Sequence, residues 1–199
     1  MFGSRLRSRT FIRARRVGED IKALGSDRRG VAAIEFAFFG SLLSIGMLNV
    51  VDVSIFAFQR MEVNNATEVG AQAAWATCSP SLPSNATAQL PATLNSNCPN
   101  LNTKVTAAVQ STSLGTNVTL QSGSPAEGYY CINASNALVY VGSVRSKPAD
   151  CSSVGNAALQ PADYIKVQTT FTYTPLFKGI TVGNLLPTTI TSTALMRLG

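Results

Sequence analysis

The longest apolar segment of the chain runs from Val31 to Phe58, and its only charged residues are Glu35 and Asp52. At about 1.5 Å per residue, an α-helix of this length is longer than the roughly 30 Å hydrocarbon core of a bilayer. We therefore predict a transmembrane helix over residues 31–58.

The helical pattern continues beyond this span. Apolar residues recur at helical spacing, acidic side chains at Glu62 and Glu68 can face solvent, and the first proline is Pro80. Periodicity of this kind predicts that the helix extends outside the membrane over residues 59–77. The apolar positions of the pattern are Met61, Val63, Ala66, Val69, Ala73 and Ala74.

The rest of the chain, residues 78–199, is predicted to be an α+β head. Residues 79–100 are rich in Pro, Ser and Asn, which is the composition of a loop, and residues 101–110 can form a short helix. Five strands are predicted at 117–121, 128–133, 138–144, 164–174 and 188–198. In the fourth, Ile165, Val167, Thr169, Phe171 and Tyr173 alternate with more polar residues. This alternation is typical of a half-buried strand, so we expect an antiparallel sheet packed against the long helix.

An apolar connection joins the last two predicted strands over residues 175–187. Two interpretations are open: a helical turn that covers the sheet edge, which we favour, or an exposed patch for a protein partner. The apolar residues concerned are Leu176, Phe177, Ile180, Leu185 and Leu186.

The net charge of +6 is confined to residues 1–30, because acidic and basic residues balance in the remainder. Basic residues beside a membrane span predict a cytoplasmic N-terminus and a head on the outer side. No second basic patch exists to form a nucleic-acid groove, so we expect no nucleic acid partner. The basic residues of this leader are Arg5, Arg7, Arg9, Arg13, Arg15, Arg16, Lys22, Arg28 and Arg29.

The four cysteines all follow the span, which fits an oxidising compartment. Four cysteines allow three disulfide connectivities. The equal intervals favour Cys78–Cys98 together with Cys131–Cys151.

Several function classes find no support. The chain contains no histidine, the commonest general base and metal ligand, and it has no nucleophile elbow, phosphate loop or dinucleotide fingerprint. The cysteines are too far apart for a paired zinc site. We expect no enzymatic activity, no cofactor and no metal. The apolar segment is also too long for an ordinary cleaved secretory signal.

The residues around Gly30 resemble a prepilin leader of the type IV class. A basic stretch ends at Arg28-Arg29-Gly30, Val31 follows, and Glu35 is the fifth residue after the glycine, with the aromatic Phe36 next. Residues 28–37, 50–53 and 59–71 look like the N-terminal region of TadE-like minor pseudopilins of the tight-adherence (Flp) pilus system. The C-terminal segments Tyr164–Val167 and Ala194–Arg197 resemble the last strands of that family more loosely, while residues 78–161 match only in composition.

The resemblance implies cleavage between Gly30 and Val31 by a prepilin peptidase. It also implies partners in the membrane: the major pilin or another minor pseudopilin, and the inner-membrane pilus assembly platform. Glu35, Phe36, Asn49 and Asp52 are then candidate assembly residues. Many relatives carry Glu where this chain has Asp52.

A carboxylate within lipid is costly unless it is neutral or paired with a cation. Cleavage after Gly30 would create such a cation, the α-amino group of Val31, which could pair with Glu35 of a neighbouring subunit and fix the register of the helices. Alternatively, Glu35 lies at the cytoplasmic headgroups and contacts water.

Asn49 and Asp52 share a helix face near the outer end of the span. Two interpretations are open. Both side chains form hydrogen bonds to a partner helix, or Asp52 marks the outer membrane–water interface, which we slightly favour. Gly40, Ser41, Ser44 and Gly46 are small residues that allow close approach of another helix.

The resemblance therefore implies a single-pass protein of the bacterial inner membrane, with a periplasmic head, that primes, caps or modulates a tight-adherence pilus used in surface attachment. It is a candidate for incorporation in the pilus itself. Two alternatives stay open: an uncleaved, membrane-anchored pilus assembly factor, and an anchored adhesin or binding module.

Overall fold

One long helix, α2, dominates the N-terminal part of the chain and spans Arg28–Cys78. It begins three residues before the predicted span and continues without interruption through the predicted extension. From Gly30 onward it is long and apolar enough to cross a membrane by length and composition, and its most apolar window is not buried within the chain.

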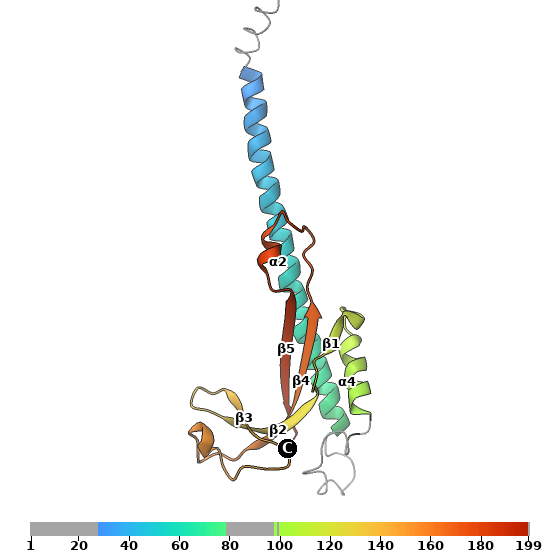
Figure 1. Ribbon diagram of the computed structural model, residues 1–199, viewed down its shortest axis with the longest axis vertical. Helices are drawn as coiled ribbons and strands as arrows, with labels where there is room; N and C mark the ends of the chain where they lie inside the picture. The colour runs from blue at the N-terminus through green and yellow to red at the C-terminus, as the bar shows by residue number, and fades with distance from the viewer. Residues whose placement is uncertain (1–27, 79–97, 99, 199) are drawn as a thin grey trace, which may run out of the picture. The chain divides into compact units, whose positions relative to one another are not determined.

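The computed structural model describes residues 28–78, 98 and 100–198 (Figure 1). The chain divides into two units: the first ends at Val50, and the second begins at Val51. The second unit contains the later part of α2 together with the head. The predicted leader up to residue 27 and most of the predicted loop, residues 79–97 and 99, lie outside the described residues.

Within the second unit, the face of α2 that packs against the head consists of small and β-branched residues. A Cβ added at Gly70 would lie 2.6 Å from Val109 Cγ2, so only glycine allows this close approach of helix α4 (Leu101–Gln110). Of the apolar positions that predicted the helical extension, Val63, Ala66 and Ala74 are buried in the core, whereas Met61 is 61% exposed on the opposite side of the helix. The buried residues of this face are Val63, Ala66, Thr67, Ala71, Ala74 and Cys78.

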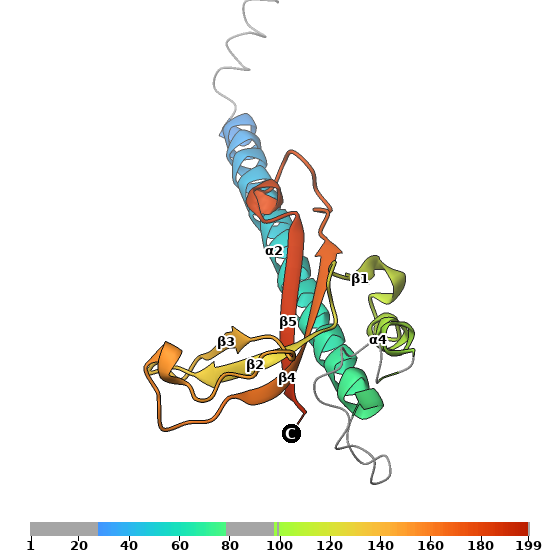
Figure 2. The ribbon, with the colours of Figure 1, turned by 60° about the horizontal axis from the view of Figure 1, so that its bottom comes forward.

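The sheet is antiparallel and is built around one long central strand, β4 (Ala162–Thr172), as Figure 2 shows. Strand β5 (Thr189–Arg197) pairs with one edge of β4 along its whole length. The other edge is shared: β2 (Ala126–Ile132) pairs with the first part of β4, and β1 (Val118–Leu120) pairs with the last part. Strand β3 (Leu138–Gly142) pairs with β2 on its outer side.

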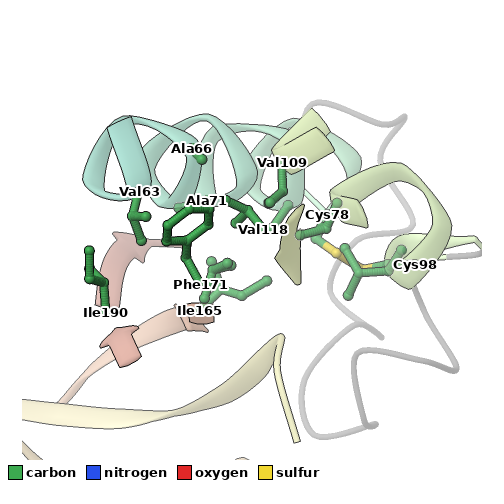
Figure 3. Close-up of a cluster of buried hydrophobic side chains, with 14 of the residues drawn as sticks. Val63, Ala66, Ala71, Cys78, Cys98, Val109, Val118, Ile165, Phe171 and Ile190 are labelled. Atoms are coloured by element: carbon green, nitrogen blue, oxygen red, sulfur yellow. A yellow bond between two sulfur atoms is a disulfide. The ribbon is translucent and has the colours of Figure 1, made fainter. Parts of the chain in front are cut away.

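Alternation along β4 places one row of side chains in the core, as the sequence predicts. Ile165, Val167 and Thr169 are fully buried, and the row meets α2 and α4 in a single apolar cluster (Figure 3). Thr169 in this row is satisfied, because its hydroxyl lies 2.6 Å from the Thr67 hydroxyl, which in turn donates to the Val63 carbonyl.

The predicted head elements agree closely with the structure. Helix α4 has the predicted bounds, and each of the five strands overlaps its predicted range, with ends that differ by one or two residues. Short 3-10 turns at Gly115–Asn117 (η2) and Ser152–Val154 (η3) were not predicted.

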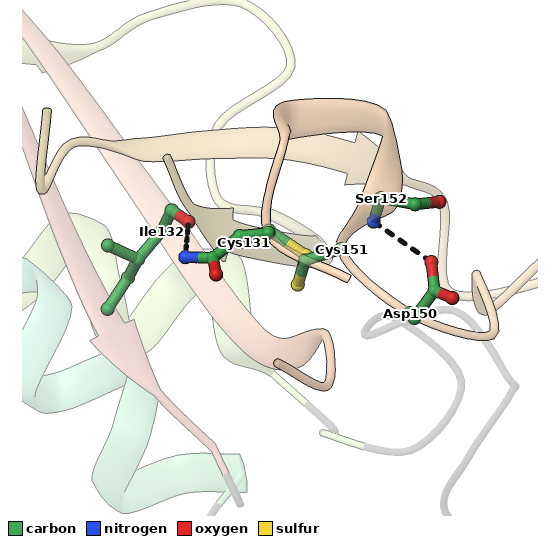
Figure 4. Close-up of a disulfide and its surroundings, with 6 residues drawn as sticks. Cys131, Ile132, Asp150, Cys151 and Ser152 are labelled. Atoms are coloured by element: carbon green, nitrogen blue, oxygen red, sulfur yellow. Dashed lines mark hydrogen bonds between the residues drawn. A yellow bond between two sulfur atoms is a disulfide. The ribbon is translucent and has the colours of Figure 1, made fainter. Parts of the chain in front are cut away.

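A second, smaller group of buried residues lies in the β2–β3 hairpin. The Tyr130 ring packs edge-on against Tyr140 and Tyr164, with ring centroids 5.6 and 5.7 Å apart respectively. Beside it, the Cys131–Cys151 disulfide joins β2 to the segment that leads into η3 (Figure 4). The hairpin therefore has a core of its own at the beginning of β4.

The β4–β5 loop, residues 173–188, contains the 3-10 turn η4 (Val182–Leu185). A helical turn is thus present, and the favoured covering role is met only in part: Leu186 packs against the core and Phe177 is half-buried, whereas the other three apolar side chains are exposed. Leu176, Ile180 and Leu185 are 63%, 62% and 84% exposed. The loop lies at the opposite end of β4 from the β2–β3 hairpin (Figures 1 and 2).

Candidate functional site

The predicted cleavage and assembly residues at the beginning of α2 are all exposed. Gly30, Glu35 and Phe36 lie near the start of the helix, and the Phe36 side chain is 79% exposed. A Cβ at Gly30, Gly40 or Gly46 would meet nothing within 4 Å. This stretch of α2 therefore offers an apolar surface, with one carboxylate in it, to whatever surrounds the first unit.

The neutral polar side chains of this stretch are satisfied within the helix. The Ser41 hydroxyl donates to the Phe38 carbonyl and the Ser44 hydroxyl donates to the Gly40 carbonyl, both at 2.8 Å. The Asn49 amide donates to the Ile45 carbonyl at 2.7 Å. Bonds of this kind remove the cost of placing a hydroxyl or amide in an apolar environment.

Asp52 has a different surrounding from the other candidate assembly residues. It is fully buried, and its partners come from the β4–β5 loop of its own chain. The Leu176 backbone N–H donates to Oδ1 at 3.0 Å, and the Thr181 hydroxyl donates to Oδ2. The Tyr173 hydroxyl also donates to the Asp52 backbone carbonyl at 3.3 Å.

Neighbouring contacts complete this Asp52 clasp, by which we mean Asp52, Tyr173, Leu176, Thr181 and Gly183. A Cβ at Gly183 would lie 2.7 Å from Asp52 Oδ2, so the loop backbone approaches the carboxylate closely. Burial and the nearby Asp52 charge raise the pKa of the Tyr173 hydroxyl, which therefore keeps its proton as a donor. The clasp fixes the β4–β5 loop to α2.

The clasp gives Asp52 a role that the sequence did not indicate. Both oxygens of its carboxylate accept bonds from its own chain, so Asp52 needs no partner helix to satisfy it. The side chain of Asn49, one helical turn earlier, donates to the Ile45 carbonyl.

Both disulfides join the pairs that the equal intervals favour. Cys78–Cys98 links the end of α2 to the residues before α4, and Cys131–Cys151 links β2 to the η3 segment, each across a separation of 20 residues. A disulfide that closes a loop of this size contributes about 3 kcal/mol of stability in the chain-entropy model.

A carboxyl pair that the sequence analysis missed lies between β2 and β4. Glu127 and Asp163 lie close enough to influence each other's titration, and Glu127 Oε2 and Asp163 Oδ1 are buried without a partner among the described residues. Burial, and then the Asp163 charge, raise the pKa of Glu127 to about 8. Burial also raises the pKa of Asp163, against a lowering influence of Lys147. At neutral pH the pair therefore holds a proton.

We expect the stability of the head to fall as the pH rises from about 4.5 to about 8. The pKa of Glu127 in the folded chain lies above its ordinary value of 4.5, so folding takes up a proton between these pH values and becomes less favourable as protons become scarce. The measurement is the thermal midpoint of the full chain in detergent at a series of pH values.

Glu127→Gln should flatten this pH dependence, because the amide keeps the shape and the hydrogen-bond donor without titrating. Glu68→Gln, at an exposed carboxylate on α2, is the matched control and should leave the slope unchanged. An equal slope in wild type and Glu127→Gln would show that the pair does not hold the proton.

In the described part of the chain, no group of three or more acidic or cysteine side chains is arranged to hold a metal ion. Comparisons with protein-family models, curated proteins and solved structures yield no match to this chain.

Proposed function

We propose that the chain is a TadE-like minor pseudopilin of a tight-adherence pilus. In this proposal residues 31–58 span the bacterial inner membrane, residues 1–30 are a cytoplasmic leader removed by a prepilin peptidase, and the head lies in the periplasm. The mature helix packs with the major pilin or another minor pseudopilin, and so primes, caps or modulates a pilus used in attachment.

The observation that carries the proposal is the exposed carboxylate of Glu35 within an exposed apolar helix, five residues after Gly30. An apolar surface of this extent is unfavourable in water and implies lipid or a partner helix around it. A carboxylate in lipid needs a cation, and cleavage after Gly30 would supply one at the same end of the helix.

The glycine positions of the span also favour packing with another helix. Gly40 and Gly46 leave the backbone open on the helix surface, and the nearby serine hydroxyls are already satisfied. Helices in membranes associate through such small residues, because lipid provides no hydrophobic driving force between them.

The two disulfides of the head favour an oxidising compartment outside the membrane, as the proposal requires.

The experiment that tests the proposal is determination of the N-terminal residue of the protein purified from its own cells. We expect the chain to begin at Val31. The site is accessible for cleavage, since Gly30 and Val31 are exposed. A chain that begins at Met1 would instead support the uncleaved, membrane-anchored assembly factor.

Gly30→Val is the variant that accompanies this measurement. A branched side chain should not fit a peptidase site that selects glycine, so the leader should be retained. Gly46→Val, at another open helix position, is the matched control and should be processed normally. Normal processing of Gly30→Val would contradict cleavage at this bond.

A further inference from the structure

The β4–β5 loop exposes more large apolar side chains than any other loop that the structure describes. Leu176, Ile180 and Leu185 are each more than half exposed, and Val182 is 44% exposed. Large apolar side chains exposed this close together in sequence are typical of an interaction site. Lys178 is the only charged residue between Thr172 and Ile190.

The position of the loop along α2 is fixed by the Asp52 clasp. The Leu176 N–H and the Thr181 hydroxyl both bond the Asp52 carboxylate, so the exposed side chains of the loop lie at the level of residue 52. The residues that flank Asp52 on the helix, Val51 and Val53, are themselves 42% and 43% exposed. Apolar helix surface and apolar loop surface therefore occur at the same level.

Helix length gives the depth of this level in a bilayer. An α-helix needs about 20 residues to cross a hydrocarbon core of roughly 30 Å. A span that begins at Val31 therefore reaches the outer boundary of the hydrocarbon close to Asp52, while the apolar segment continues to Phe58. Beyond Asp52, Ile55 and Phe56 pack against the core of the head, and the Phe56 and Tyr173 ring centroids are 5.0 Å apart. Val53 and Phe58, which are 43% and 55% exposed, need a less polar environment than water.

The loop carries one lysine and no exposed carboxylate, which fits the surface of a lipid bilayer. The single nearby carboxylate, Asp52, is buried with both oxygens bonded, so the loop presents no exposed acid. Lys178 is exposed, and a lysine at this level can extend its ammonium to anionic headgroups while its methylenes stay among apolar groups.

We propose that the β4–β5 loop is a membrane-contact element, in which Leu176, Ile180, Val182 and Leu185 insert into the outer interfacial layer of the bilayer beside the span. Lys178 then lies among anionic headgroups. The inference rests on the proposed transmembrane role of α2 and adds a second contact with lipid, which fixes the height and tilt of the head above the membrane.

The test uses tryptophan fluorescence, because the chain has a single tryptophan, Trp75. In a Trp75→Phe background, Leu185→Trp places a reporter on the loop at a position that is 84% exposed. The full chain is reconstituted into vesicles of phosphatidylethanolamine and phosphatidylglycerol, with either ordinary or brominated acyl chains. We expect blue-shifted emission from this loop reporter and strong loss of that emission in brominated vesicles.

Two further reporters separate the possible failures. Phe39→Trp in the same background reports the span, and native Trp75 is the control that lipid should not quench. Quenching of the span reporter but not of the loop reporter would overturn the loop proposal alone, whereas no quenching of either would overturn the span as well. Protection of the loop reporter from both brominated lipid and aqueous acrylamide would assign the loop to a protein contact and overturn the proposal.

Discussion

Asp52→Ala is expected to destabilise the head by about 3 kcal/mol, because hydrogen bonds to a charged acceptor contribute roughly 1.5–3 kcal/mol each and two of them are lost. The Leu176 N–H and the Thr181 hydroxyl would be left near a small cavity without an acceptor. In a chain of this size, the loss corresponds to a decrease of about 6–12 °C in the thermal midpoint. Thermal unfolding of the full chain in detergent measures it.

The same variant should release the β4–β5 loop from α2. Lys178 is an exposed trypsin site within this loop, so limited trypsin digestion in detergent should cleave after Lys178 faster in Asp52→Ala than in wild type. Asp52→Asn retains one acceptor oxygen and should show a smaller effect. Glu68→Ala removes an exposed carboxylate from the same helix and is the control that should change neither measurement. A wild-type midpoint and digestion rate in Asp52→Ala would show that the clasp does not hold the loop.

The strands and helices of the head could be predicted because each is encoded locally. Period-two alternation from Ile165 to Tyr173 identifies β4 and its buried face, and glycine and proline residues mark where strands stop. The helix α4 follows from Leu101, Val105 and Val109, which repeat every four residues and are all buried. Such patterns fix an element and the face that it buries.

The order of the strands could not be predicted, because alternation specifies a face but not a neighbour. In the structure β1 and β2 share one edge of β4, separated by Val167 and Gln168. There the Gln168 N–H donates to the Ser124 hydroxyl, and its carbonyl accepts from the Gln121 N–H. This break in the ladder depends on turn geometry between β1 and β2 that the residue pattern does not specify.

The roles of Asp52 and of the Glu127–Asp163 pair were missed for the same reason. Leu176 and Thr181 are more than a hundred positions away from Asp52 in sequence, and Glu127 meets Asp163 only through the register of β2 against β4. A carboxylate in an apolar helix indicates that a partner is needed. Only the tertiary structure shows that the partners of Asp52 come from its own chain. Glu35, by contrast, is exposed.

Two carboxylates of α2, Asp52 and Glu35, differ in whether their own chain supplies a partner. Asp52 is satisfied by its own chain, so its burial requires no second subunit. Glu35 lies among exposed apolar side chains such as Ile34 and Phe36, which are 72% and 79% exposed. If this surface is covered in the pilus, Glu35 is the carboxylate that needs a cation from outside the chain.

Glu35→Ala is expected to be cleaved normally after Gly30 but to assemble poorly. Removing one member of a buried ion pair costs about 3–5 kcal/mol, because the other charge stays buried and unpaired. Here that charge is the α-amino group of Val31 on the neighbouring subunit. Since 1.4 kcal/mol corresponds to a factor of ten, incorporation should fall at least about a hundredfold. The measurements are filament yield after shearing and the N-terminal residue of the membrane pool.

Glu35→Gln distinguishes charge from shape, because the amide is almost the same size but cannot neutralise an amine. We expect Glu35→Gln to assemble as poorly as Glu35→Ala, and Glu68→Gln, outside the apolar segment, to assemble like wild type. Rescue of assembly by glutamine would assign Glu35 a hydrogen-bonding role without charge. Wild-type filament yield in Glu35→Ala would place the carboxylate at the cytoplasmic headgroups, where water satisfies it and no neighbouring amine is required.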